Sequence, residues 1–229
     1  MFNSRNILFF FLLVISNTTY GQATRMQTKI LSLGNTKVEI IQRYNSVQAV
    51  CSAKILIYVS GQKKDSIIFP SMEAVGGDVG LFLCKDRIKN HIIISKFGDY
   101  DGQTIVINDR GQKFVFGGGR NYADKEQGII FCIYDSDLPG FSVFDLTKDQ
   151  LIIDTADIDG YPNKFYKKGG HYYCELVDLQ TNSHTIWEID FNSKSIKYLY
   201  NLTKDFDAKP LSKLEFSKDL NCEIMYTNY

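Results

Sequence analysis

Two short motifs place paired carboxylates beside a glycine, an arrangement that can offer oxygen ligands to calcium. Both read Asp-x-Asp-Gly, so Asp99 with Asp101 and Asp157 with Asp159 are the candidate metal ligands. Calcium takes about 6 to 8 oxygen ligands, and each motif supplies only part of such a shell. Because aspartate and glycine also form tight turns, a purely structural role competes with metal binding. Calcium is the one cofactor that the sequence leaves open.

Four further side chains are candidates for contact with a ligand. Arg120 and Tyr122 follow three consecutive glycines, residues 117–119. No helical pattern follows these glycines, so we expect a flexible loop between strands rather than a phosphate cradle. Tyr161 and Tyr166 belong to an aromatic-rich block that could stack on sugar rings, although aromatic residues in strands are usually core. Of the block, Tyr161 is predicted to lie on a loop at the surface.

No catalytic residues can be assigned. The sequence has no Gly-x-Ser-x-Gly, His-Glu-x-x-His or Walker-type motif. Pairing the predicted hairpin about its turn sets His184 beside Val177 and His171 beside Asp190, so the two imidazoles should not meet. A glycosidase-like pair of carboxylates would come together only in the fold, and no spacing selects one. The sequence therefore favours a binding protein over an enzyme.

The start of the chain resembles a bacterial secretory signal peptide over residues 1–21. Arg5 is followed by an unbroken apolar run, residues 7–15, and a polar stretch that ends on a small residue. The run is too short to span a bilayer as a stable helix. We expect the mature protein to begin near Gln22, to be secreted or periplasmic, and to form one domain over residues 22–229.

The charge balance argues against two classes of partner. Lysine plus arginine and aspartate plus glutamate both total 26, and the mature chain has no basic run. Nucleic acid and anionic membranes are therefore poor candidates. No later apolar segment reaches membrane-spanning length, so we expect no membrane insertion after signal cleavage.

A succession of short strand signals runs through the mature chain. Apolar positions nowhere keep a period of 3.6 for three turns, so few or no long helices are expected. The predicted strands are residues 37–42, 48–51, 55–59, 66–69, 80–84, 91–97, 104–108, 113–116, 129–134, 141–146, 151–154, 164–167, 171–177, 185–190 and 196–199. This pattern predicts an all-β fold.

Some of these strands repeat. Segments that end on Cys84, Cys132 and Cys174 share glycine, then apolar or aromatic residues, then cysteine, and a weaker copy surrounds Cys222. Residues 141–146 also match residues 186–191 in the strand that follows. The repeat recurs about every 40 to 50 residues with four strands per unit, as in β-propeller blades.

Over most of its mature length the chain resembles β-propeller repeat proteins in general. The resemblance implies an array of four-stranded antiparallel meanders with four to five blades, complete or incomplete. The segment at residues 97–107 faintly resembles the cation loop of integrin-type propellers, but Thr104 stands where a further acidic ligand is expected. A β-sandwich is the alternative fold.

The five cysteines are expected to remain thiols. Equivalent positions on neighbouring blades are separated by roughly 10 Å, beyond the roughly 7 Å between Cα atoms that a disulfide bridges. No two cysteines have the spacing of a metal-ligand pair. We therefore expect most or all of them to be buried as small apolar residues.

The function expected from these features is binding through loops on one face of the array, with a protein or a glycan as the partner. Two alternatives remain. One is a carbohydrate-active hydrolase or lyase that uses carboxylates, and the other is an envelope inhibitor or immunity-type protein, whose sign would be a compact exposed apolar patch. The sequence does not define the ligand, the strand register or the oligomeric state.

Overall fold

The computed structural model describes residues 24–45, 50–73, 79–98, 102–134 and 139–217, and these ranges form strands and turns. They contain no helix that could cross a membrane. The predicted signal peptide and Cys222 lie outside the described residues. The strands are β1 (Thr24–Leu33), β2 (Thr36–Asn45), β3 (Val50–Val59), β4 (Gln62–Glu73), β5 (Gly80–Cys84), β6 (His91–Phe97), β7 (Gln103–Asn108), β8 (Lys113–Gly117), β9 (Arg120–Asp124), β10 (Ile129–Ile133), β11 (Gly140–Asp145), β12 (Gln150–Ala156), β13 (Tyr161–Lys168), β14 (His171–Asp178), β15 (Ser183–Asp190), β16 (Ser195–Asn201), β17 (Lys209–Pro210), β18 (Ser212–Lys213) and β19 (Phe216–Ser217).

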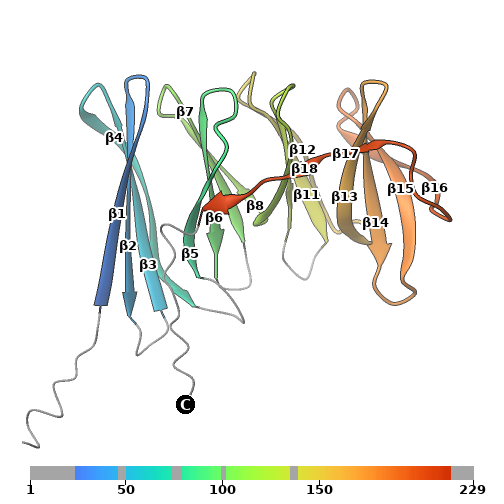
Figure 1. The fold of residues 1–229 in the computed structure, drawn as a ribbon, viewed down its shortest axis with the longest axis horizontal. Helices are drawn as coiled ribbons and strands as arrows, with labels where there is room; N and C mark the ends of the chain where they lie inside the picture. Colours follow the sequence, from blue (N-terminus) through green and yellow to red (C-terminus); the bar gives the residue numbers. More distant parts are fainter. Residues whose placement is uncertain (1–23, 46–49, 74–78, 99–101, 135–138, 218–229) are drawn as a thin grey trace, which may run out of the picture.

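Sixteen of these strands form four antiparallel meanders that stand side by side (Figure 1). We call them the first sheet (β1–β4), the second (β5–β8), the third (β9–β12) and the fourth (β13–β16). Each sheet pairs its strands in chain order, and the sheets stack face to face. The predicted all-β, propeller-like array of four-stranded units is confirmed.

Three apolar cores lie between successive sheets and explain why burial differs among strands. In the first sheet, β2 alternates buried residues such as Val38 with more exposed ones such as Glu39, because only one face meets a neighbour. In the third sheet every residue of β10 and β11 is buried, since sheets pack on both faces. Phe131 faces Phe165 of the fourth sheet with ring centroids 4.7 Å apart, while Cys132 belongs to the core shared with the second sheet.

The end of the described chain ties three of the sheets together. Residues 209–217, which we call the strap, run back across the array and add a short strand to three first strands: β17 to β13, β18 to β9, and β19 to β5 (Figure 1). The Leu214 N–H donates to the carbonyl of Asn121 at 2.8 Å, and its side chain is buried between the second and third sheets. Contacts far apart in sequence therefore hold the sheets in order.

The structure differs from the predicted strands in several places. The strand β1 was not predicted. The described part of the strand expected at residues 48–51 and the strand expected at residues 55–59 form a single strand, β3. The strand β9 occupies part of the region expected to be a flexible loop. Gly118, two residues before β9, is buried with φ +90°, and a Cβ there would lie 1.9 Å from the Ile133 carbonyl oxygen. This close approach requires glycine and holds the turn in place.

The cysteine repeat is correct for two sheets and shifted for a third. Cys132 and Cys174 lie on second strands, β10 and β14, but Cys84 lies on β5, a first strand. First and second strands both combine glycine with an apolar run, so the motif alone does not distinguish them. The four described cysteines are buried thiols, as predicted. Burial raises the pKa of Cys84 to about 11 and that of Cys132 to about 12, so both stay neutral and pack as apolar groups.

Candidate functional site

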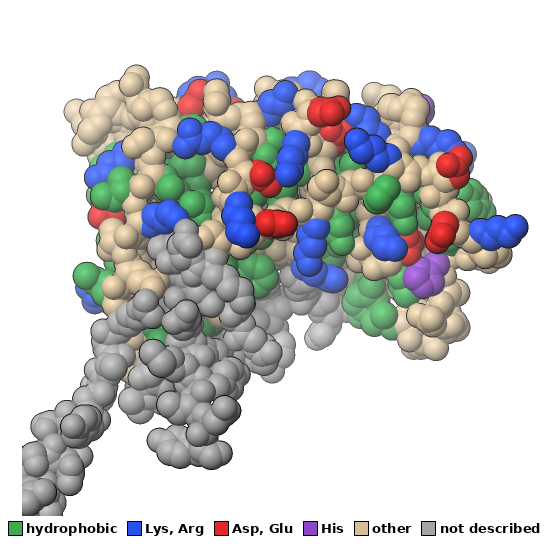
Figure 2. Space-filling model, in the orientation of Figure 1, with side chains coloured by type: hydrophobic (Ala, Val, Ile, Leu, Met, Phe, Trp, Pro, Cys, Tyr) green, Lys and Arg blue, Asp and Glu red, His purple; other side chains and the backbone are tan. Residues whose placement is uncertain are grey.

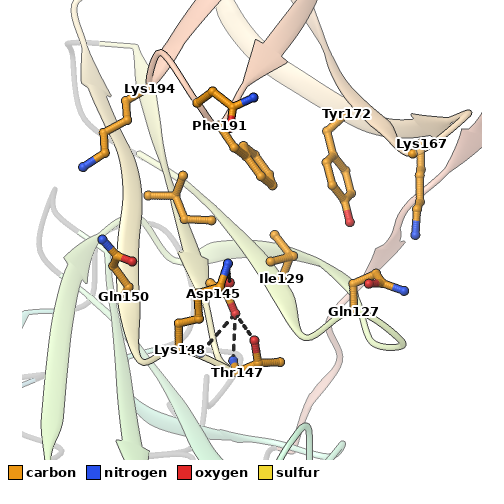
Figure 3. A pocket seen from close by; sticks show the side chains of 13 residues that line it. Gln127, Ile129, Asp145, Thr147, Lys148, Gln150, Lys167, Tyr172, Phe191 and Lys194 are labelled. Carbon is orange, nitrogen blue, oxygen red and sulfur yellow. Dashed lines mark hydrogen bonds and ion pairs between the residues drawn. The ribbon is translucent and has the colours of Figure 1, made fainter.

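A cleft of about 560 Å³ opens between the third and fourth sheets, at the end where the first-to-second and third-to-fourth strand turns lie (Figure 3). Its lining combines apolar and aromatic side chains with amides, ammonium groups and one carboxylate from the turns and the strand ends. The lining residues are Gln127, Ile129, Asp145, Thr147, Lys148, Gln150, Ile152, Lys167, Gly170, Tyr172, Phe191, Asn192 and Lys194.

Two turns of the same form build opposite sides of the cleft. Asp145 ends β11, and its carboxylate accepts hydrogen bonds from the N–H groups of Thr147 at 2.8 Å and Lys148 at 3.2 Å. Asp190 ends β15 and accepts in the same way from the Asn192 N–H at 2.8 Å. Aspartate stabilises such turns because its short side chain reaches backbone N–H groups two and three residues ahead. Repetition of this turn brings polar side chains from two sheets to one opening.

An aromatic pair forms one wall of the cleft. The rings of Tyr172 on β14 and Phe191 in the β15–β16 turn are stacked, with centroids 5.0 Å apart and an interplanar angle of 18° (Figure 3). The Tyr172 hydroxyl donates to Asp124 at 2.9 Å. Burial, together with that carboxylate, raises the pKa of Tyr172, so the phenol remains a neutral donor.

Three lysines reach the cleft, and they differ in how they are paired. Lys167 Nζ lies 2.6 Å from Asp124 Oδ2, and Lys148 Nζ lies 3.1 Å from Asp145 Oδ2. Lys194 lines the cleft without an ion pair to any residue in the described part of the chain. The cleft therefore carries one ammonium group that no described carboxylate neutralises.

Asp145, which lines the cleft, and Asp124, which pairs with Lys167 beside it, both have a lowered pKa. Burial acts against the charge of Asp124, but hydrogen bonds from Lys167, the Gln127 N–H and Tyr172 outweigh it and lower its pKa. The pKa of Asp145 is likewise lowered, because bonds from Thr147 and Lys148 outweigh the burial. An acid catalyst needs a carboxyl that keeps its proton near neutral pH, so neither group has the character of a glycosidase acid.

The four predicted ligand-contact residues lie apart from the cleft. Arg120 is exposed at the start of β9, and Tyr122 is half-buried in the same strand, where its hydroxyl donates to a backbone carbonyl at 3.0 Å. Tyr161 begins β13 and so is not on a loop, and it is half-buried. Tyr166 is buried and donates to Glu175. Ligand contact by these four residues stays a prediction.

The candidate calcium ligands are only partly described. Asp99 and Asp101 lie outside the described residues. Asp157 and Asp159 are exposed in the turn between β12 and β13. Within the described ranges, no group of three or more His, Cys, Asp or Glu is placed to hold a metal ion.

The histidine positions agree with the predicted hairpin. His184 pairs with Val177 across β14 and β15, as the turn position predicts. His184 Nδ1 lies 2.7 Å from Glu175, and His171 Nδ1 lies 3.0 Å from Glu188. Each imidazole therefore has its own carboxylate partner within the fourth sheet.

Sequence reasoning did not single out the lysines and the phenylalanine of the cleft. A usable signal was present, because matching residues 141–146 to 186–191 sets Leu146 opposite Phe191. The same match sets the turn that contains Lys148 opposite the turn that ends at Lys194. Only the stacking of the third and fourth sheets shows that these two turns share an opening.

Comparison with known proteins shows a weak structural likeness. A scan against protein-family models gives no match, and no curated protein matches. Among solved structures the chain is similar to the β-propeller domain of the Trilobed protease from Pyrococcus furiosus, described as having an open velcro topology, with a TM-score of 0.37 and 7% identity. The match covers 80% of this chain and 58% of that chain, so this chain spans little more than half of its length. The propeller-like arrangement is therefore defined by the four stacked sheets themselves.

Proposed function

We propose that this is a secreted or periplasmic binding protein that holds a glycan in the cleft between the third and fourth sheets. The observation that carries the proposal is the stacked pair of Tyr172 and Phe191 beside a rim of amide and ammonium side chains. Aromatic rings offer a flat apolar surface to the C–H face of a sugar, while amides and ammonium groups bond its hydroxyls.

The setting of the cleft suits a ligand site. Five of its polar side chains stand on short turns between strands, and such turns commonly carry binding residues on a rigid scaffold. Gln127, Gln150 and Asn192 supply amides that both donate and accept hydrogen bonds, as sugar hydroxyls require.

The size and shape of the cleft favour a glycan over a protein partner. Its volume of about 560 Å³ lies within the range of roughly 300 to 1,000 Å³ that is typical of small-molecule sites. A stable protein interface needs about 800 Å² of surface on each partner. On the face that carries the strap, acidic and basic side chains are interspersed, without a broad patch of one sign (Figure 2).

A binding measurement with one variant and one matched control tests the proposal. Phe191→Ala removes half of the stacked wall and should weaken the affinity for a bound glycan by about tenfold, since loss of an aromatic stack is worth roughly 1 to 1.5 kcal/mol. The control is Leu179→Ala, at an exposed apolar residue in the β14–β15 turn at the opposite end of the fourth sheet. Calorimetric titration with acidic and neutral oligosaccharides gives the affinities, and circular dichroism checks folding. Equal affinities for the two folded variants, or no glycan binding, would reject the proposal.

The location of the protein can be tested separately. If residues 1–21 are removed on export, mass spectrometry of periplasmic and culture fractions should show an amino-terminal peptide that begins near Gln22. An intact amino terminus confined to the cytoplasmic fraction would contradict this part of the proposal.

A further inference from the structure

Among the described residues, the cleft has more hydrogen-bond donors without a partner than acceptors without one. We propose, resting on the proposed function, that the glycan is negatively charged: an oligosaccharide that carries carboxylate groups, bound by the ammonium groups of Lys148, Lys167 and Lys194. A lysine ammonium has three donors and no acceptor, whereas an ionised carboxylate only accepts.

The two aspartates that pair with Lys148 and Lys167 already have their donors. Asp145 Oδ1 accepts from the Thr147 N–H at 2.8 Å and its hydroxyl at 2.6 Å, and Oδ2 faces Lys148 Nζ. Asp124 accepts from the Gln127 N–H at 3.2 Å, from Lys167 and from the Tyr172 hydroxyl. Neither aspartate depends on a ligand to satisfy its oxygens.

The ammonium groups, in contrast, have donors left. Lys148 and Lys167 each direct one bond to a carboxylate, and Lys194 makes none with another described residue. Lys194 and Lys167 lie on opposite sides of the opening (Figure 3). A ligand rich in acceptors and bearing negative charge would satisfy donors on both sides at once.

The backbone at Lys194 supports a ligand role for this side chain. Lys194 ends its turn in the left-handed region with φ 55°, where the matching positions of two other turns hold Asn182 and Asp149, each with φ 52°. Asparagine and aspartate tolerate this region better than lysine. Asp149 has partners there, since it accepts from His91 at 2.7 Å and from Arg110. No described contact of the Lys194 side chain explains the choice of lysine.

A second hollow suggests an extended ligand. A space of about 180 Å³ beside the strap shares Lys167 with the cleft and is also lined by Lys125, Lys209, Asp124 and Glu126. Lys167 therefore lies where the two hollows meet. A chain of several sugars could follow this path from the turns toward the strap, which a single sugar could not.

The composition of the lining favours carboxylated sugar over phosphate. No arginine lines either hollow, whereas arginine is the side chain best matched to phosphate because it bonds two oxygens at once. The aromatic wall requires a ligand with an apolar face beside its charges, which inorganic phosphate lacks.

Calorimetric titration of the purified protein at low ionic strength tests the charge of the ligand. The probes are oligogalacturonate, a neutral galacto-oligosaccharide, inorganic phosphate and a single-stranded oligonucleotide. Oligogalacturonate should bind at least about tenfold more tightly than the neutral probe, and added salt should weaken its binding.

Two lysine variants locate the effect. Lys194→Asn keeps a residue that tolerates the left-handed turn and removes the charge, so the affinity for oligogalacturonate should fall about three- to tenfold while the stability to urea is unchanged or higher. Lys63→Asn, at an exposed lysine on β4 of the first sheet, is the matched control and should leave the affinity unchanged.

The outcomes separate the inference from the function on which it rests. Equal binding of neutral and charged oligosaccharides would overturn the inference and leave the glycan cleft standing. Binding of neither would reject both. Phosphate or the oligonucleotide binding as tightly as oligogalacturonate, or equal affinities for Lys194→Asn and Lys63→Asn, would overturn the inference as well.

Discussion

The first and fourth sheets both lie at an end of the array, but their outer faces differ in whether another segment of the chain covers them. The fourth sheet has strands of 7 to 8 residues, a strap strand and a covering loop, residues 202–208. The first sheet has strands of 10 to 12 residues and no strap strand among the described residues. In the part of the chain that the structure describes, the outer faces of the two end sheets have no neighbouring sheet to pack against. The carboxyl-terminal segment covers the outer face of the fourth sheet.

The outer face of the fourth sheet carries a cluster of aromatic rings around Phe206 and a network of hydrogen bonds around Glu175. The Phe206 ring lies 5.1 Å from Tyr166, 5.2 Å from Tyr173 and 6.3 Å from Tyr200 between centroids. Glu175 on the same side is 2% exposed and accepts from Tyr166, from Asn163 at 2.8 Å and from His184 at 2.7 Å. The carboxylate and its donors satisfy one another, as a buried charge requires.

The outer face of the first sheet keeps apolar side chains in the open. Met26 is 60% exposed, Ile30 55% and Ile68 61%. Charged neighbours such as Lys37 and Glu39 share this face. From this comparison we expect the outer face of the fourth sheet, which the carboxyl-terminal segment covers, to contribute more to stability than the outer face of the first. Equivalent substitutions at the two ends should therefore lower the free energy of unfolding by different amounts.

The largest difference is expected from removal of an outer-face glutamate. Glu175→Leu leaves the Tyr166, Asn163 and His184 donors without their acceptor and should lower the free energy of unfolding by about 3 kcal/mol. The matched change Glu39→Leu in the first sheet should cost less than about 0.5 kcal/mol. Urea unfolding measures both, and similar losses would contradict the comparison.

A smaller difference is expected from the apolar residues at the two ends. Phe206→Ala removes the cover over three tyrosines and should cost about 2 kcal/mol, less than for a fully buried phenylalanine. Ile30→Ala, at a residue more than half exposed, should cost less than about 0.5 kcal/mol. Thermal unfolding of the two variants, followed by circular dichroism, compares them, and an equal fall in melting temperature would show that the loop does not stabilise the fourth sheet.

The smallest expected effect is the loss of stability at low pH that comes from protonation of Glu175. Burial acts against the charge of Glu175, but bonds from Tyr166, His184 and Asn163 outweigh it, so its pKa in the folded state lies below the ordinary value of 4.5. The resulting stability is therefore fully present above about pH 4.5 and is lost as the pH falls through the lowered pKa. Calorimetric scans at neutral pH and at pH values below 4.5 should show this loss in the natural protein and a smaller one in Glu175→Leu. The same acid sensitivity in both would assign it to other carboxylates.

Much of the fold could be predicted from sequence because turns and strand periodicity are local. The four strands of the fourth sheet follow from glycines 169 and 170 and from polar turns that end at Asn182 and Lys194. The strand β9 could not be predicted in the same way, since its glycine-rich approach is held by tertiary contacts such as the 2.7 Å bond from Thr104 to the Gly118 carbonyl. The strap could not be predicted from the sequence either, because its short strands form only by pairing with strands that are distant in sequence.

The site was harder to predict than the fold. The aromatic-rich block predicted from the sequence contains buried and half-buried rings. Only Tyr172 of the block lines the cleft, and it does so although it is mostly buried. Side-chain direction within the block depends on strand register, including a shift between Pro162 and Lys164 in β13. The lysines of the cleft have no distinctive spacing, since their proximity arises from the stacking of two sheets.

Hydrogen exchange measured by mass spectrometry, with and without oligogalacturonate, tests most directly whether the opening between the third and fourth sheets holds the ligand. Protection should appear in the three turns at residues 125–128, 146–149 and 191–194, and exchange in the first sheet should not change. Protection confined to the first sheet, or no protection under conditions in which calorimetry detects binding, would contradict the assignment of this cleft.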